Sequence, residues 1–176
     1  MTNIAFTGKA GSGKTSAAEL LMESVPLGYR CLSFADPLKL VVGYLWGEKA
    51  RRDRGRLQNV GDALRAEDPD VFARAWLKRT RSHTGPLLCD DLRRENEWWA
   101  AKEAGFVIVR VHSDRGLRIE RLRANGKLQH DDQLEHVSET ELDDFDADWT
   151  IFNDGTKMEL AESVFGVVNR VQRVMA

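Results

Sequence analysis

Short, mostly apolar runs alternate with amphipathic stretches along this chain of 176 residues. The apolar runs are typical of buried strands and lie at residues 4–7, 30–34, 86–89, 106–111 and 148–152. Between them, apolar residues recur at helical spacing at 14–25, 37–46, 71–79 and 94–104, and in a last stretch after Thr156. Near-continuous apolar strands that alternate with helices predict an α/β fold, in which helices cover both faces of a five-stranded parallel sheet.

Turn and capping residues mark the boundaries of several of these elements. Pro37 favours the first turn of a helix, and either Asp68 or Asp70 is suited to cap the helix that follows it. Residues 47–57 are rich in Gly, Arg and Lys, which predicts an exposed connection. Because the sequence contains no internal repeat and no linker, we expect a single domain over residues 1–176.

A complete GxxxxGK[ST] motif follows the first predicted strand. The residues of this loop, with the serine that comes after it, are Gly8, Lys9, Ala10, Gly11, Ser12, Gly13, Lys14, Thr15 and Ser16. A strand, a glycine-rich turn and a helix in this order are the context in which the motif binds nucleotide phosphates. The backbone N–H groups of such a loop converge on an anion, and the helix N-terminus adds positive potential.

Two side chains of this loop are expected to contact the nucleotide directly. Lys14 is expected to reach the β- and γ-phosphates, and the Thr15 hydroxyl is expected to hold Mg²⁺. The sequence therefore predicts binding of a nucleoside triphosphate together with magnesium.

Arginines are concentrated directly after the fourth predicted strand, at Arg115, Arg118, Arg121 and Arg123. Ligands of open α/β sheets bind at the carboxyl ends of the strands, so this stretch begins beside the expected triphosphate. Phosphoryl transfer needs positive charge over the migrating group, and arginine supplies it through a fixed fork of donors. We therefore expect residues 113–130 to form a mobile lid, in which Arg115, Arg118 and Arg121 are the candidates to reach the phosphates.

An acidic stretch follows the expected lid. Residues 131–148 contain nine Asp and Glu residues and no Lys or Arg. We expect these carboxylates to form a solvated face that pairs with the basic stretch at 110–127.

Two further groups of polar residues follow predicted strands. After the second strand, Asp36 has two possible roles: it orients or deprotonates an attacking oxygen, or it caps the helix that begins at Pro37. Lys39, three residues later, is suited to neutralise an acceptor phosphate. After the third strand, one of Asp90 and Asp91 is expected to order the Mg²⁺ shell, while the other caps the next helix.

Composition and charge exclude several other classes of protein. Hydrophobic residues make up 42% and charged residues 31% of the chain, which suits a compact globular enzyme, and the net charge of −2 gives no case for binding nucleic acid. No apolar stretch approaches the roughly 20 residues of a membrane span. Cys31 and Cys89 have no metal-ligand spacing and are expected to be buried free thiols in a reducing cytoplasm. Trp98 and Trp99 cannot both face inward on a helix, so one is available either for a subunit contact in a homodimer or for a nucleotide contact.

Five further segments occur in a characteristic order. They are SFADPLK at 33–39, LQNVGDALR at 57–65, DLRRENE at 91–97, HVSE at 136–139 and FNDGT at 152–156. Together with the loop at 8–15, they make the chain closely similar to the bacteriophage deoxynucleoside monophosphate kinases over nearly all of its length. One departure is Arg94-Glu95, where relatives often carry an aromatic residue and a proline.

This resemblance implies a P-loop kinase fold, a three-layer sandwich with an arginine-rich lid and an acceptor-binding insert at about 36–82. It implies transfer of the γ-phosphate of ATP, with Mg²⁺, to a 2′-deoxynucleoside 5′-monophosphate in the cytoplasm of the host cell. The residues that the resemblance assigns to the acceptor are Asp36, Lys39, Arg65, Asp91 and Arg93. With Asp91 matching the family's D-x-R, magnesium is expected at Thr15 and Asp91.

Two other interpretations are compatible with the same motifs. The first is a P-loop kinase with another acceptor, such as dephospho-coenzyme A, a sugar or a modified base in DNA. The second is a nucleotide-dependent switch or binding module. A switch has no need of a second phosphate pocket, so the expected arginine-rich lid and the SFADPLK segment argue against it.

Overall fold

The computed structural model describes residues 1–24, 28–126 and 140–174. The strands are β1 Ile4–Thr7, β2 Arg30–Cys31, β3 Leu87–Leu92, β4 Val107–His112 and β5 Trp149–Phe152. The helices are α1 Lys14–Ser24, α2 Asp36–Trp46, the 3₁₀ helix η1 Glu48–Arg52, α3 Arg54–Glu67, α4 Val71–Thr80, α5 Glu95–Glu103, α6 Arg115–Ala124 and α8 Lys157–Val174.

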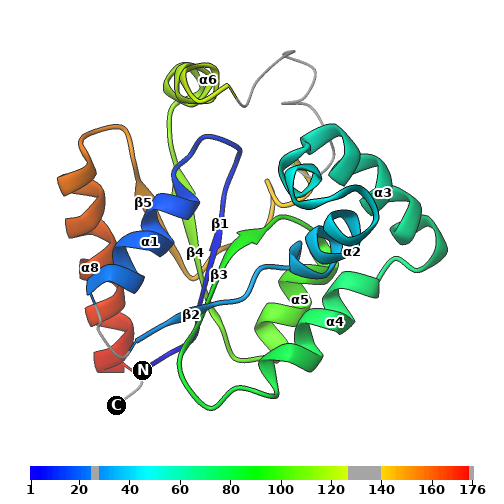
Figure 1. Ribbon diagram of the computed structural model, residues 1–176. Helices are drawn as coiled ribbons and strands as arrows, with labels where there is room; N and C mark the ends of the chain where they lie inside the picture. The colour runs from blue at the N-terminus through cyan, green and yellow to red at the C-terminus, as the bar shows by residue number, and fades with distance from the viewer. Residues whose placement is uncertain (25–27, 127–139, 175–176) are drawn as a thin grey trace.

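The strands form one sheet in the order β2-β3-β1-β4-β5, and every pair in it is parallel. Helices α1 and α8 cover one face of the sheet, and α4 and α5 cover the other (Figure 1). This arrangement is an α/β three-layer sandwich, which confirms the fold class predicted from the hydrophobic pattern.

The two faces of the central strand explain why the strand sequences are apolar without interruption. Ile4 and Phe6 pack among the residues of α1 and α8, whereas Ala5 between them packs into the cluster beneath α4 and α5. Successive side chains of a strand point to opposite faces, so a strand that is covered on both sides must be apolar at every position.

Helices α2, α3 and α4 share a smaller apolar cluster of their own. Leu38 and Val42 of α2 and Phe72 of α4 are buried there, and α3 contributes partly buried Val60 and Leu64. This group of helices stands beside the carboxyl ends of the strands, and α6 lies above the same edge (Figure 1). The functional site must therefore lie between these two groups of helices.

Residues 47–57 differ from the exposed connection that their composition predicts. They contain η1 and the first turns of α3, whose N-terminus is capped by Asp53, since its side chain accepts the N–H of Arg56 at 3.0 Å. Leu57 of the same helix packs into the small cluster. The sequence pattern did not reveal this helix. The segment is rich in Gly and Arg, and the narrow apolar face of the helix packs against other helices rather than against the main core.

Two strands also differ from their predicted ranges. β2 is limited to Arg30–Cys31, although the N–H of Leu32 still donates to the carbonyl of Leu88 at 2.8 Å. β3 continues to Leu92, so Asp90 and Asp91 belong to the strand itself, at a point where its register with β1 shifts.

Two smaller expectations concern tryptophans and cysteines. Trp98 is buried and Trp99 is 59% exposed, as expected. Both cysteines are free thiols, but only Cys89 is buried as expected, whereas Cys31 is partly exposed. Among the helices described, none is long and apolar enough to cross a membrane.

Candidate functional site

The phosphate-binding loop connects β1 to α1 and follows a path that only glycine can adopt at three positions. Gly8, Gly11 and Gly13 have φ values of 132°, 78° and 103°. A Cβ atom on Gly13 would collide with the side-chain amide of Asn153, and one on Gly8 would collide with the carbonyl of Val111. The loop therefore combines positive φ angles with close approach to β4 and to the β5–α8 connection, as the glycine positions of the motif require.

Lys14 lies inside the curve of this loop. Its side chain is buried, and its ammonium donates to the carbonyl oxygens of Gly8 and of Lys9, the latter at 2.9 Å. A second buried polar group of the loop is the Ser12 hydroxyl, which has no hydrogen-bond partner among the described residues. Both groups suit an anion that enters the loop.

Thr15, at the start of α1, contacts the end of β3. Its hydroxyl donates to Asp90 Oδ2 at 3.1 Å, and the hydroxyl of Ser33 donates to Asp90 Oδ1 at 2.9 Å. Asp90 is therefore the carboxylate that β3 presents to the phosphate-binding loop. The structure brings together Thr15 and Asp90, rather than Thr15 and Asp91 as the resemblance suggested.

Asp91 is occupied by backbone groups of the β2–α2 connection. Its two carboxylate oxygens accept the N–H groups of Phe34 and Ala35, at 2.8 and 3.0 Å. Burial, together with the neighbouring charge of Asp90, raises the pKa of Asp91 above its ordinary value. Asp91 thus fixes the β2–α2 connection. It does not cap α5, whose N-cap residue is Arg94, and its expected role at magnesium stays a prediction.

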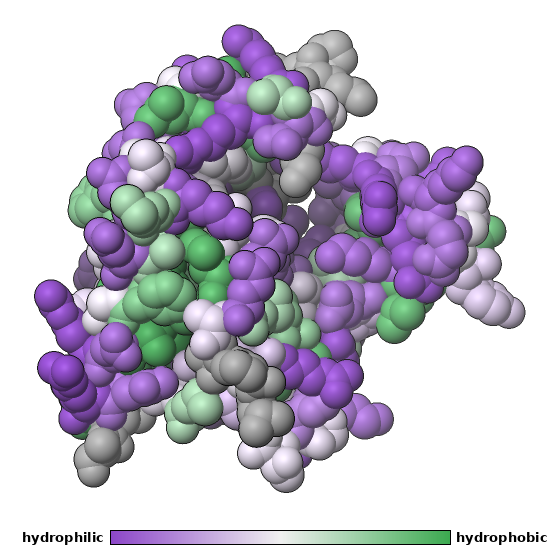
Figure 2. Space-filling model, turned by 60° about the vertical axis from the view of Figure 1, so that its left-hand side comes forward, coloured by the Kyte–Doolittle hydropathy of each residue, from purple (hydrophilic) through white to green (hydrophobic). Residues whose placement is uncertain are grey.

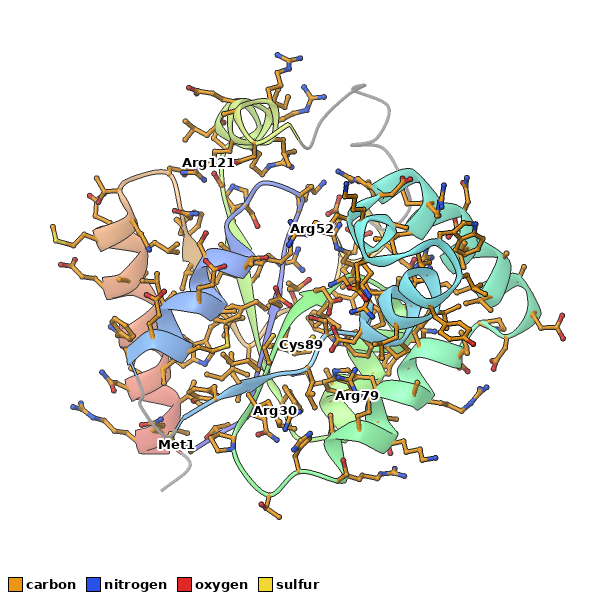
Figure 3. The ribbon with its side chains drawn as sticks, viewed as in Figure 1. Met1, Arg30, Arg52, Arg79, Cys89 and Arg121 are labelled. Atoms are coloured by element: carbon orange, nitrogen blue, oxygen red, sulfur yellow. The ribbon has the colours of Figure 1, made fainter. Side chains whose placement is uncertain are left out.

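Asp36 is placed differently from both of its expected roles. It lies in the first turn of α2, where Ala35 is the N-cap residue, and its carboxylate accepts the N–H of Ser33 at 3.1 Å. The same oxygen forms an ion pair with Arg79 of α4 at 2.8 Å. Asp36 is not among the residues that line the cleft, and Arg79 lies well below the edge of the sheet that carries α6 (Figure 3).

Arg65 also lies away from the cleft, although the resemblance assigns it to the acceptor phosphate. Its guanidinium stacks on the ring of Phe72, with Cζ 4.7 Å from the ring centroid. It lies 3.6 Å from a carboxylate oxygen of Asp62 and 3.9 Å from one of Glu97. These contacts hold α3 against α4 and α5, which is a structural role.

The expected lid arginines divide into three environments on α6. Arg115 and Arg123 are exposed, whereas Arg118 is buried and donates to the carbonyl oxygens of Ser113 and Ala10. Arg121 is half-buried between α6 and the β5–α8 connection and lines the cleft (Figure 3). Arg118 is thus turned toward the backbone of the loop rather than the cleft. Residues 127–130 of the expected lid, and the HVSE segment, lie outside the described residues.

A cleft of about 560 Å³ extends from the phosphate-binding loop toward α2 and α3. It is lined by Ala10, Gly11, Gly13, Lys14, Thr15, Ser16, Lys39, Arg54, Asp90, Asp91, Arg93, Arg121, Leu122, Asn125, Asn153, Gly155, Lys157 and Leu160. Figure 2 shows the molecule hollowed between the α6 side and the α2–α3 side, with hydrophilic side chains at the rim. The cationic side chains of the cleft come from both sides, so the cleft suits two anionic groups.

Sequence reasoning missed some of these lining residues. Arg54 is the first residue of α3, which the sequence pattern did not predict. Asn153 belongs to the FNDGT segment, and its position directly after a predicted strand was the signal that could have identified it.

The acidic stretch forms different pairs from those expected. Within its described part, Asp143 pairs with Lys9 of the phosphate-binding loop at 2.7 Å, and Asp148 pairs with Lys102 of α5 at 2.7 Å. Glu141 lies 3.4 Å from Arg94. The partners of these three carboxylates therefore lie on the loop and at α5. From the basic stretch, Arg110 contacts the backbone of the acidic stretch instead, because its guanidinium donates to the carbonyl oxygens of Leu142 and Phe145.

Burial strongly perturbs three ionisable groups near the end of β3. It raises the pKa of the Cys31 thiol to about 12 and that of the Cys89 thiol well above its ordinary value, so neither is a reactive thiolate at neutral pH. Glu97 of α5 is buried beside Asp91, and its pKa is raised to about 7. Its carboxylate accepts the N–H groups of Arg93 and Arg94 at 3.0 and 3.2 Å.

Comparison with known proteins identifies the family and the fold. A family model described as "AAA domain" (AAA_18) matches residues 4–143, and no curated protein matches the sequence. A gluconokinase from Sinorhizobium meliloti 1021 has a TM-score of 0.63 at 19% identity, covering 99% of this chain and 95% of that one. Shikimate kinase from Acinetobacter baumannii, in complex with shikimate, has a TM-score of 0.58 at 16% identity, covering 97% and 94%. The APS kinase of Mycobacterium tuberculosis, in complex with AMPPNP and APS, has a TM-score of 0.57 at 17% identity, covering 96% and 98%.

These similar structures are all kinases of small molecules, and at such identities the likeness shows the fold alone. The family model, in contrast, covers well over half of the sequence. The chain therefore belongs to the AAA domain family and has the fold of the P-loop kinases.

Proposed function

We propose that the chain is an ATP-dependent kinase that phosphorylates a deoxynucleoside monophosphate. The observation that carries the proposal is the distribution of charge in the cleft. The phosphate-binding loop forms one end, and Lys39, Arg54 and Arg93 line it from α2, α3 and the end of β3. A second cationic group suits an acceptor that is itself an anion.

The donor end of the cleft fits ATP with magnesium. Thr15 and Asp90 offer only oxygen ligands, which Mg²⁺ prefers, and no group of three or more His, Cys, Asp or Glu side chains suited to a metal occurs in the described part of the chain. A site with one or two protein ligands that is completed by phosphates and water is the usual arrangement for this ion in kinases. When bound, magnesium neutralises the charge of the β- and γ-phosphates.

The carboxylates of the cleft favour a phosphate acceptor over a hydroxyl acceptor. A hydroxyl group must lose a proton as it attacks, so a carboxylate within reach assists it, whereas a phosphate oxygen is already anionic. Among the described residues that line the cleft, the carboxylates are Asp90, which accepts from two hydroxyl groups, and Asp91, which accepts from two backbone N–H groups. Asp36 is paired with Arg79. None of the three is suited to act as the base.

In the proposed reaction an oxygen of the acceptor phosphate attacks the γ-phosphorus of ATP. The bond from that phosphorus to the β–γ bridging oxygen breaks, and ADP leaves with the electron pair. Lys14 and the amides of the loop hold the charge on the donor phosphates, and Lys39, Arg54 and Arg93 hold the acceptor. Catalysis then consists mostly of positioning and charge neutralisation.

The deoxynucleoside part of the proposal rests on the sequence segments shared with the bacteriophage kinases. A screen of acceptors distinguishes a deoxynucleoside monophosphate from acceptors of other kinds, such as dephospho-coenzyme A or a sugar. Release of ADP from ATP–Mg²⁺ should accelerate with one or more deoxynucleoside monophosphates and not with hydroxyl acceptors. Acceleration by a sugar alone would overturn the proposal, and slow release that no acceptor changes would favour a nucleotide-dependent switch.

A substitution at the acceptor end tests the geometry. Arg54→Ala should raise the acceptor KM about 10- to 150-fold, which corresponds to a charge-assisted hydrogen bond of about 1.5–3 kcal/mol, and should leave the KM for ATP nearly unchanged. Lys78→Ala is the control, because it removes the same charge from an exposed position of α4 outside the cleft. Equal effects of the two substitutions would contradict a specific role for Arg54.

A further inference from the structure

Two buried side chains hold the backbone of the phosphate-binding loop from outside. A guanidinium nitrogen of Arg118 donates to the carbonyl of Ala10 at 3.3 Å, and Nδ2 of Asn153 donates to the carbonyl of Ser12 at 2.8 Å. Both side chains are less than a tenth exposed. The donors come from α6 and from the β5–α8 connection, which are far from the loop in sequence.

The chemistry of an anion-binding loop explains why such partners are needed. When successive backbone N–H groups turn inward toward an anion, carbonyl oxygens of the same loop must turn outward. A buried carbonyl that lacks a donor is destabilised, so a loop without these partners would favour conformations that expose its carbonyls to water. Arg118 and Asn153 therefore stabilise the conformation that receives phosphate.

The two side chains are also connected to each other. Arg118 Nε donates to the carbonyl of Ser113 at 3.2 Å, and Arg121 donates to the Ser113 hydroxyl at 3.1 Å and to the Asn153 carbonyl at 2.9 Å. Ala10 of the loop packs with Leu122 of α6 in a small apolar cluster. Helix α6, the β5–α8 connection and the loop thus form one connected unit.

We propose that Arg118 and Asn153 are positioning residues that hold the phosphate-binding loop in its anion-receiving shape. Arg118 acts through the loop backbone, not as an arginine that contacts the transferred phosphoryl group. The inference rests on the proposed function only where it concerns the rate of turnover. The effect of these two residues on the binding of a polyphosphate can be measured without an acceptor and without a reaction.

The test is the binding of inorganic tripolyphosphate and of ADP, measured by calorimetry on Arg118→Met and Asn153→Leu. Both substitutions remove the donor and approximately keep the volume, and each should weaken the binding of both ligands about tenfold or more. Arg170→Met is the matched control, because Arg170 is exposed on α8, and it should change neither affinity by more than about twofold. Arg118→Lys keeps a donor near the Ala10 carbonyl and should recover most of the affinity.

A comparison of ligand affinity with kcat separates a positioning role from a direct catalytic role. If Arg118→Met left the affinities for tripolyphosphate and ADP unchanged and lowered only kcat, Arg118 would be a catalytic residue and the proposal would be wrong. If Arg118→Met failed to fold, Asn153→Leu would decide, and unchanged affinities for both ligands in a folded Asn153→Leu protein would overturn the proposal. A loss of polyphosphate binding in a protein that phosphorylates no acceptor would leave the positioning role intact and refute the proposed function alone.

Discussion

Glu97 allows a sharp test of how this structure couples burial to stability. Its carboxylate is buried in α5, accepts the N–H groups of Arg93 and Arg94, and lies 3.9 Å from Arg65. Burial, with a contribution from Asp91, raises its pKa from the ordinary value of 4.5 to about 7. The perturbation is Glu97→Gln, which keeps the volume and an accepting oxygen but cannot ionise.

The expected magnitude follows from the difference in proton binding between the folded and unfolded chains. Between pH 4.5 and about 7 the folded chain retains the Glu97 proton that the unfolded chain has already lost. The contribution of Glu97 to the free energy of unfolding therefore falls as the pH rises through this interval, by about 3 kcal/mol in total. Glu97→Gln lacks this titration. The variant should thus gain about 3 kcal/mol relative to the original protein over the same interval, whatever the difference at the acidic end.

Urea denaturation of both proteins at several pH values between about 4.5 and 8 measures this difference directly. Glu95→Gln, which removes a carboxylate from the exposed face of the same helix, is the matched control for the loss of a side-chain charge. The remaining carboxyl groups are the same in the original protein and in both variants, so their contributions to the difference largely cancel. A difference between Glu97→Gln and the original protein that does not change with pH would refute the reasoning.

Three further substitutions test other parts of the site. Lys14→Ala should leave a folded protein but abolish most ADP release, and near-normal turnover would contradict the donor site. Asp90→Asn should raise the Mg²⁺ concentration that gives half of the maximal rate about tenfold. Asp91→Asn should lower thermal stability without changing that Mg²⁺ concentration. The reverse pattern would assign the metal role to Asp91. Arg65→Ala should lower the free energy of unfolding by about 1–3 kcal/mol and should change the KM values for ATP and for the acceptor less than about twofold. A strong rise in the acceptor KM alone would contradict the structural role of Arg65.

The phosphate-binding loop shows what can be read from contiguous sequence. Its chemistry depends on backbone N–H groups, on glycines at fixed intervals and on a lysine beside them, all within the eight residues from Gly8 to Thr15. The strands were equally accessible, because burial on both faces of the sheet leaves a local record as a run of apolar residues. Helix α3 left a weaker record, since only a narrow stripe of it, including Leu57 and Leu64, packs against other helices.

Side-chain direction at the site was decided by the tertiary structure. Asp90 and Asp91 are adjacent and lie where the register between β3 and β1 shifts, so the alternation of a regular strand does not give their directions. Only the packing of β3 beside β1 and α1 determines that Asp90 meets Thr15. The same holds for Arg118 and Arg121, one turn apart on α6, where the packing of the helix on the loop buries one and leaves the other at the cleft.

The sequence by itself determined the five strands, most of the helices between them and the phosphate-binding loop, and it led to the expectation of a second anion site. Each of these depends on the spacing of residues close together in the chain. The tertiary structure decided that Arg54, rather than Arg65, lines the cleft, and that Asp90 lies beside Thr15. It also decided that Asn153 supports a loop 141 positions earlier in the sequence. These assignments depend on contacts between distant segments, and the packing that creates such contacts has no signature in the local pattern of a single sequence.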